Sequence, residues 1–228
     1  MSKVELVCIS QPRIEGVKSA EELIAYAARV SNPSNQLNTN TAPKLLQYLA
    51  KNSHWSPFEM VSMTVGITTT RDIARQILRH RSFSFQEFSQ RYTVQSNFVL
   101  REARMQDPKN RQSSHDTDDN ALKMAWLDKQ TNIISAAENA YTWALENGIA
   151  KEQARAVLPE GCTESVLYMA GTIRSFLHLI KVRNHPATQK EHREIAQKIQ
   201  EIILSEFPTL RDVVEQMIDE NYQSYSNR

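Results

Sequence analysis

The stretch RHRSFSFQEFSQRY, residues 79 to 92, is the most informative part of this chain, because it gathers positive charge around aromatic side chains. It begins with Arg-His-Arg and has a further arginine near its end, with phenylalanines and serines in between. Glu87 is its only carboxylate. Over the whole chain, 27 lysines and arginines nearly balance 26 aspartates and glutamates. The cluster is therefore a local feature and not part of a broad basic surface.

The segment before the cluster has the spacing of an amphipathic helix. Four apolar side chains between residues 71 and 80 fall within about 140° of one helical face, namely Ile73, Ala74, Ile77 and Leu78. The opposite face carries Arg75, Gln76 and Arg79. Residues 82–92 lack the helical period, so we expect extended backbone beside the end of the helix. This arrangement resembles a cradle for a polyanion.

The residues alone leave three explanations of the cluster open. A solvated helix face, with Glu87 neutralising one arginine, would show the same charges. A module for RNA or single-stranded DNA would use Phe83, Phe85 and Phe88 as stacking platforms, although the small net charge argues against it. A nucleotide or dinucleotide phosphate site agrees best with the sequence, because exposed charges are rarely interleaved with phenylalanines. Each arginine–phosphate contact contributes about 1.5–3 kcal/mol when partly desolvated, so such a ligand would offset the repulsion between the arginines. The composition indicates no reaction.

The rest of the chain alternates helices with a few strands. We expect strands over 4–9, 60–70 and 165–171, and a solvated loop over 104–120. Helices are expected over 19–30, 41–51, 71–80, 120–147, 151–158 and 172–183, and from residues 188 and 209 onward. Ser19 and Glu22 form a capping box, and Gly148 is suited to end the longest helix. These elements predict one α+β domain over 1–228, with a central antiparallel or mixed sheet flanked by long helices.

Several kinds of site and location are excluded by what the sequence lacks. No stretch approaches the roughly 20 apolar residues of a membrane helix, so we expect a cytoplasmic protein without membrane or nucleic-acid partners. The five glycines form neither a dinucleotide fingerprint nor a P-loop, and the six histidines are scattered. We therefore expect no metal site, and any phosphate must be held largely by side chains. Cys8 and Cys162 are expected to be small buried hydrophobic residues.

The cluster matches a family signature. RHRSFSFQEFSQR satisfies R-H-R-x-x-S-x-x-x-x-S-x-R and resembles the flavin-dependent thymidylate synthases. The resemblance extends over nearly the whole chain, through AYAARVSNP (25–33), HWSPFE (54–59), IARQILRHR, ARAVLP (154–159) and GTIRSFLHLIKVR (171–183). It departs from some members at Thr172 and His178, where those carry asparagine. It suggests no role for His185, Gln189 or His192.

The resemblance implies a homotetramer with active sites shared between subunits. Such an enzyme makes dTMP from dUMP, with methylene-tetrahydrofolate as carbon donor and FAD, reduced by NADPH, as hydride donor. The implied FAD ligands are Ser31, Ser56, Arg79, His80, Arg81, Glu87, Thr172, Arg174 and His178. The implied dUMP ligands are Gln76, Arg79, Glu87, Phe88, Ser89, Gln90, Arg91, Arg155 and Arg183. Arg183 corresponds to the residue that activates the substrate.

An arginine suits that activating role. Carbon 5 of uracil is a better nucleophile once the base begins to lose its N3 proton, and a cation beside N3 and O2 favours the resulting anion. Lowering the pKa of N3 by about two units requires roughly 2.7 kcal/mol. An arginine about 4 Å away contributes about 4 kcal/mol at an effective dielectric near 20. Ser89 is an alternative covalent nucleophile, but a serine needs an adjacent base, so we favour a phosphate-binding hydroxyl.

Overall fold

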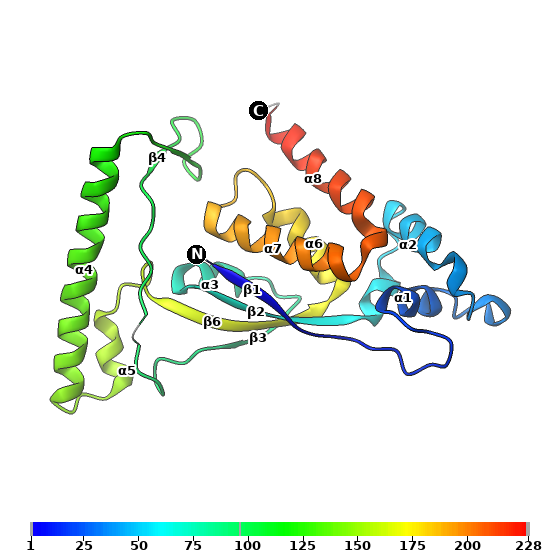
Figure 1. Cartoon of the computed structure of the whole chain (residues 1–228), viewed down its shortest axis with the longest axis horizontal. Coiled ribbons are helices and arrows are strands. Elements are labelled where there is room, and N and C mark those ends of the chain that lie inside the picture. Colours follow the sequence, from blue (N-terminus) through cyan, green and yellow to red (C-terminus); the bar gives the residue numbers. More distant parts are fainter. Residues whose placement is uncertain (1, 96, 227–228) are drawn as a thin grey trace. The chain divides into compact units, whose positions relative to one another are not determined.

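The computed structural model describes residues 2–95 and 97–226, which fold into two compact units (Figure 1). The first unit contains residues 68–79 and 86–167 together with Ser2, and the second contains 3–67, 80–85 and the described residues from 168 onward. Each unit thus draws on separate parts of the sequence. The prediction of a single domain over 1–228 stays a prediction.

A four-stranded sheet has the strand order β1-β2-β6-β3. Its strands are β1 (Lys3–Ile9), β2 (Ser62–Thr70), β3 (Ser84–Glu87) and β6 (Glu164–Thr172). Contacts at the strand ends show that neighbours run antiparallel. Ser10 N–H donates to the Ser62 carbonyl, which pairs the end of β1 with the start of β2, and Phe88 N–H donates to the Val166 carbonyl near the start of β6. The α+β class is confirmed, and the sheet is antiparallel.

Helices in the second unit pack around a large apolar core. They are α1 (Ala20–Ala28), α2 (Ala42–Lys51), α6 (Ile173–Arg183), α7 (Lys190–Glu206) and α8 (Arg211–Ser226). Helix α7 packs against both β1 and α6, and α8 also contacts α6. Phe58, Phe176 and Phe207 are fully buried in this unit. Gly171 is required on β6, because a Cβ atom there would lie 2.4 Å from the ring of Phe83.

The first unit contains α3 (Arg71–Ile77), α4 (Asn120–Glu146) and α5 (Lys151–Ala154). Helix α4 is the long green helix of Figure 1. Its N-cap is Asp119, whose side chain accepts a hydrogen bond from Leu122 N–H at 2.9 Å. It is followed by Gly148, which has φ 76°. The predicted cap at Gly148 is therefore confirmed, since this backbone conformation favours glycine.

Most predicted elements occur within two residues of their expected ends, and the differences have local causes. The strand expected from residue 60 begins at Ser62, because residues Ser56–Met60 form a 3-10 helix. Segment 151–158 splits into α5 and a 3-10 turn, Arg155–Val157. Only half of the predicted capping box is present: Ser19 Oγ accepts from Glu22 N–H at 3.2 Å, whereas the Glu22 carboxylate accepts from the N–H of Lys18, one residue before Ser19.

Two sequence predictions are wrong. The segment 104–120 is not only a loop: β4 (Arg104–Gln106) and β5 (Ser114–Asp116) pair antiparallel. Its polar side chains form a hairpin that needs no apolar face, with Arg104 Nε donating to Ser114 Oγ at 2.9 Å. Cys8 is exposed and Cys162 is only partly buried. Within the described residues, no helix is both long and apolar enough to cross a membrane.

Candidate active site

In the first unit, Glu87 is the centre of a charged network. Helix α3 carries Arg71 and Arg75, and β3 ends at Glu87. The Nη1 atoms of Arg71 and Arg75 lie 3.6 and 3.4 Å from the two carboxylate oxygens of Glu87. Ser165 Oγ donates to Glu87 Oε1 at 2.9 Å, and Arg75 Nε contacts Glu160 at 3.2 Å. Three side chains therefore hold the carboxylate, two from α3 and one from β6.

Arg71 is the buried member of this network. Only 8% of the residue is exposed. Burial lowers the pKa of its guanidinium, and the neighbouring Glu87 carboxylate opposes that shift. Among the described residues, its buried Nη1 has no hydrogen-bond partner, because Glu87 is beyond hydrogen-bonding distance. Arg71 was not predicted from the sequence, although it follows a strand and precedes Arg75 in the same helix.

Four further predicted dUMP ligands lie in the loop after β3 and beside α5. Arg91 Nε lies 3.6 Å from Glu152 Oε2, and Arg155 Nε donates to the backbone carbonyl of the same Glu152 at 3.2 Å. Ser89 Oγ accepts from Arg91 N–H at 3.4 Å. Gln90 is buried and donates to Gln95 at 3.4 Å. The structure thus brings Arg91 and Arg155 to one residue, Glu152.

In the second unit, the last residue of α6 contacts the R-H-R motif. Arg183 Nε donates to Nε2 of His80 at 2.8 Å. Burial is the main cause that lowers the pKa of His80 to about 4, and the Arg183 charge and His178 act in the same direction. His80 is therefore a neutral acceptor at neutral pH. This contact joins the predicted activating residue to a predicted flavin ligand.

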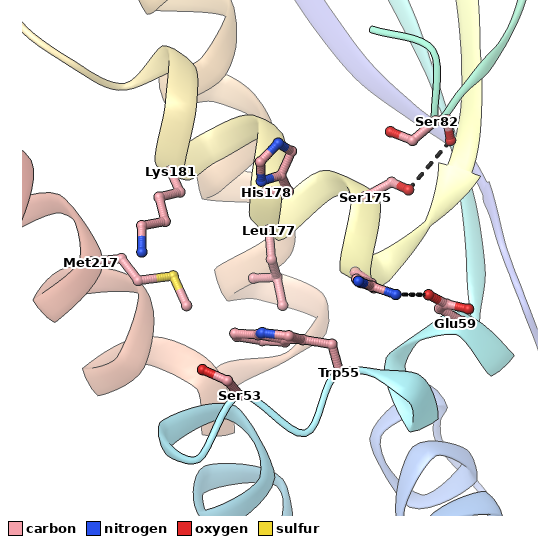
Figure 2. A pocket seen from close by; sticks show the side chains of 10 residues that line it. Ser53, Trp55, Glu59, Ser82, Ser175, Leu177, His178, Lys181 and Met217 are labelled. Carbon is pink, nitrogen blue, oxygen red and sulfur yellow. Dashed lines mark hydrogen bonds and ion pairs between the residues drawn. The ribbon is translucent and has the colours of Figure 1, made fainter.

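The second unit also contains a cavity of about 460 Å³ (Figure 2). This volume is within the range of small-molecule sites, roughly 300–1,000 Å³. Its lining includes the predicted flavin ligands Arg174 and His178. Arg174 pairs with Glu59, and Ser175 Oγ donates to the Ser82 carbonyl at 3.3 Å. The residues that line it are Ser53, Trp55, Glu59, Ser82, Arg174, Ser175, Leu177, His178, Lys181 and Met217.

Lys181 and Trp55 are two lining residues that sequence analysis missed. Arg174, His178 and Lys181 follow one another at i, i+4 and i+7, so they share one face of α6. Figure 2 shows both His178 and Lys181 extending from this helix, with Lys181 beside Met217. Trp55 lies on the opposite wall, with its ring 5.6 Å from that of Phe58. The helical spacing from Arg174 could have identified Lys181.

The remaining predicted FAD ligands have different positions. Thr172 caps α6, with Oγ1 accepting from Ser175 N–H at 3.4 Å. Ser56 is exposed next to Trp55, and Arg81 is exposed beside Ser82. Ser31 is exposed beyond α1 and is not among the residues that line this cavity. Within the described part of the chain, no group of three or more His, Cys, Asp and Glu residues could hold a metal ion.

The predicted ligands are divided between the two units. The first unit contains Gln76, Arg79, Glu87, Phe88, Ser89, Gln90, Arg91 and Arg155. The second unit contains Ser31, Ser56, His80, Arg81, Thr172, Arg174, His178 and Arg183. Each unit brings some of its own ligands together. One site formed by both groups stays a prediction.

Comparison with known proteins identifies close relatives. A family model described as "Thymidylate synthase complementing protein" matches residues 14–209. A probable flavin-dependent thymidylate synthase of Paramecium bursaria Chlorella virus 1 is 48% identical over 207 residues, 90% of this chain and 95% of the relative. A flavin-dependent thymidylate synthase of Synechocystis is 49% identical over 215 residues, 94% of this chain and 96% of the relative. Among solved structures, the UMP/dUMP methylase PolB from Streptomyces cacaoi, bound with 5-Br dUMP, is similar with TM-score 0.80 and 28% identity over 95% of each chain.

Proposed function

This chain belongs to the family of flavin-dependent thymidylate synthases, and we propose that it methylates dUMP to dTMP with methylene-tetrahydrofolate as carbon donor and NADPH as reductant of its FAD. The contact that carries the proposal joins Arg183 Nε to His80 Nε2 at 2.8 Å. It pairs the residue suited to activate uracil with the R-H-R motif. PolB, described as a UMP/dUMP methylase, supports a uracil nucleotide as the substrate.

The cavity of the second unit fits part of FAD. Arg174 and Lys181 offer positive charges for phosphates, with Arg174 exchanging its partner Glu59, and Trp55 offers an aromatic wall opposite them. FAD, when bound and reduced, supplies the hydride that completes the methyl group. The protein supplies the positions of the groups around it. Ser56, Arg79, Arg81, Glu87 and Thr172 are proposed as further ligands on the strength of the family motif.

The two arginines beside Glu152 are proposed to bind the phosphate of dUMP. Arg91 and Arg155 both contact Glu152, and their guanidinium groups are exposed enough to exchange that partner for a phosphate. Ser89 adds a hydroxyl next to Arg91. Arg183 would then face N3 and O2 of the base, where its charge stabilises the anion. Ser89 has no role as a nucleophile in this proposal.

The reaction itself is tested by mixing the protein with FAD, NADPH, methylene-tetrahydrofolate and dUMP. We expect dTMP, measured by chromatography, and none when any one component is omitted. UMP in place of dUMP tests whether the 2′-hydroxyl is accepted, as the name of PolB suggests for that enzyme. A protein that binds no FAD, forms no dTMP and binds oligonucleotides with a steep salt dependence would instead be a nucleic-acid module.

Replacing Lys181 by glutamine should weaken FAD binding about fivefold to tenfold, the loss expected for one exposed charge-assisted contact of about 1–1.4 kcal/mol. Riboflavin lacks phosphates, so its affinity should not change. Lys181→Arg should keep FAD binding close to wild type. Fluorescence titration measures all three affinities, with Lys198→Gln on α7 as the charge-matched control. Equal losses for FAD and riboflavin would show that Lys181 does not contact phosphate.

We also propose that the protein is a homotetramer. Helix α4 exposes apolar side chains that a solvated helix rarely carries, with Trp126, Ile133 and Trp143 being 42%, 55% and 60% exposed. A second subunit would bury such a face. The cytoplasmic location expected from the sequence stays a prediction.

Glutamate at both Trp126 and Ile133 should break the tetramer, because two charges would then have to be buried in the contact between subunits. Light scattering should give four times 26.2 kDa for the wild type and a smaller mass for this variant. Ser135→Glu, on the opposite face of α4, is the control and should stay tetrameric. A variant of unchanged mass would place the subunit contact elsewhere.

A further inference from the structure

The ring of His192 packs against the ring of His80, the residue that accepts the hydrogen bond from Arg183. It is in the first turn of α7, and only 1% of it is exposed. Its ring centroid lies 6.2 Å from that of His80 at an interplanar angle of 87°, an edge-to-face arrangement. Phe83 contacts His80 in the same way, with centroids 6.3 Å apart and an angle of 83°. His80 is therefore fixed by two rings from different elements.

The hydrogen bond from Arg183 determines the protonation of His80. Nε of a guanidinium can only donate, so Nε2 of His80 must be the acceptor and its proton must reside on Nδ1. Burial, together with the charge of Arg183, keeps both imidazoles neutral: the pKa of His80 is lowered to about 4 and that of His192 to about 3. The charged or titratable groups acting on them are Arg183 and His178 for His80, and Arg183 and His80 for His192.

We propose that His192 is a positioning residue, whose buried ring holds the His80 imidazole in the orientation that accepts from Arg183 Nε. The hydrogen bond from Nε to a fixed acceptor restricts rotation of the guanidinium plane. If the acceptor ring turned, this restraint would weaken and the charge of Arg183 would face N3 of the base for less of the time. This inference rests on the proposed role of Arg183, and it assigns a role to a residue that the family signature does not contain.

The neutral state of His80 and His192 also affects the orientation of Arg183. A protonated His80 could not accept the hydrogen bond and would repel the guanidinium. A neutral imidazole orients Arg183 without cancelling its charge, whereas a carboxylate in the place of His80 would reduce the field at the substrate. His192, packed edge-on, adds a polarisable ring and no net charge.

The test compares His192→Leu with Ile199→Val, a core change two turns further along α7. We expect His192→Leu to lower kcat about tenfold, while the KM for dUMP and the FAD content stay within about threefold of wild type. Ile199→Val should leave kcat within about twofold. His192→Phe, which keeps an aromatic edge, should recover part of the lost kcat, and it is the main variant if the leucine protein does not fold.

A second readout does not depend on catalysis. ¹⁵N-histidine labelling gives signals from six imidazoles, which single substitutions assign. Wild-type His80 should show a protonated Nδ1 and an unprotonated Nε2 at pH 7, and His192→Leu should show a mixture of tautomers. A kcat equal to that of Ile199→Val, or a single unchanged His80 tautomer in His192→Leu, would overturn the proposal. If wild type makes no dTMP, the proposed reaction fails while the tautomer measurement still tests the positioning.

Discussion

Arg183→Ala is expected to lower kcat for dTMP formation by about 10³-fold while leaving a folded, yellow protein. A cation about 4 Å from the developing uracil anion contributes about 4 kcal/mol at an effective dielectric near 20, and each 1.36 kcal/mol corresponds to roughly a factor of ten. Arg183 ends α6, so its removal leaves the apolar core of the unit in place. The measurements are kcat at saturating dUMP, flavin absorbance and thermal unfolding.

One further variant separates charge from geometry at this position, and a second, at a distant arginine, is the control. Arg183→Lys keeps a positive charge but loses the Nε–H that donates to His80, so its kcat should lie between those of wild type and Arg183→Ala. Arg211→Ala removes an exposed arginine that pairs with Glu215 on α8 and should leave kcat within about twofold. An Arg183→Ala enzyme that retains a tenth of wild-type turnover would remove Arg183 from the activating role.

The secondary structure was largely predictable because its signals are local. The apolar period of residues 71–80 placed Ile73, Ala74 and Ile77 in the interior, where they are buried. Ser19 and Gly148 marked helix ends through preferences of one residue each. The hairpin of residues 104–116 was missed because polar hydrogen bonds between side chains and backbone stabilise it. The exposure of Cys8 was missed because the apolar strand around it gives no sign of which face is covered.

The residues of the family signature could be predicted from the sequence. The residues that contact them only in the folded chain could not. His80 and Arg183 are 103 positions apart, and no local pattern indicates that they touch. The burial of Arg71 depends on β6 returning next to α3, where Arg71 N–H donates to the Thr163 carbonyl at 2.9 Å. His192 likewise contacts His80 only in the folded chain, since the two residues are far apart in the sequence. Buried partners of a site are therefore the residues that spacing cannot identify.

Glu87→Gln is expected to cost about 3 kcal/mol of stability, because it leaves the buried Arg71 guanidinium without a countercharge. For a chain of this length, that loss corresponds to a fall in Tm of roughly 6–12 °C. The side chains of Arg71 and Glu87 are only 10% and 15% exposed. Glu160→Gln is the matched control: Glu160 pairs with Arg75 while 57% exposed, so its loss should cost less than about 1 kcal/mol. Equal costs for both variants would mean that burial of Arg71 needs no carboxylate.

A double variant, Arg71→Met with Glu87→Gln, separates the structural role of Glu87 from its proposed role as a ligand. Replacing both members of a buried pair by groups of similar volume is often nearly neutral, so the double variant should recover most of the Tm lost by Glu87→Gln. Binding of dUMP, measured by calorimetry, should stay weak in both proteins if Glu87 contacts the nucleotide. Recovery of both stability and dUMP affinity would show instead that Glu87 acts only by neutralising Arg71, and that the family's ligand at this position has become a structural residue in this chain.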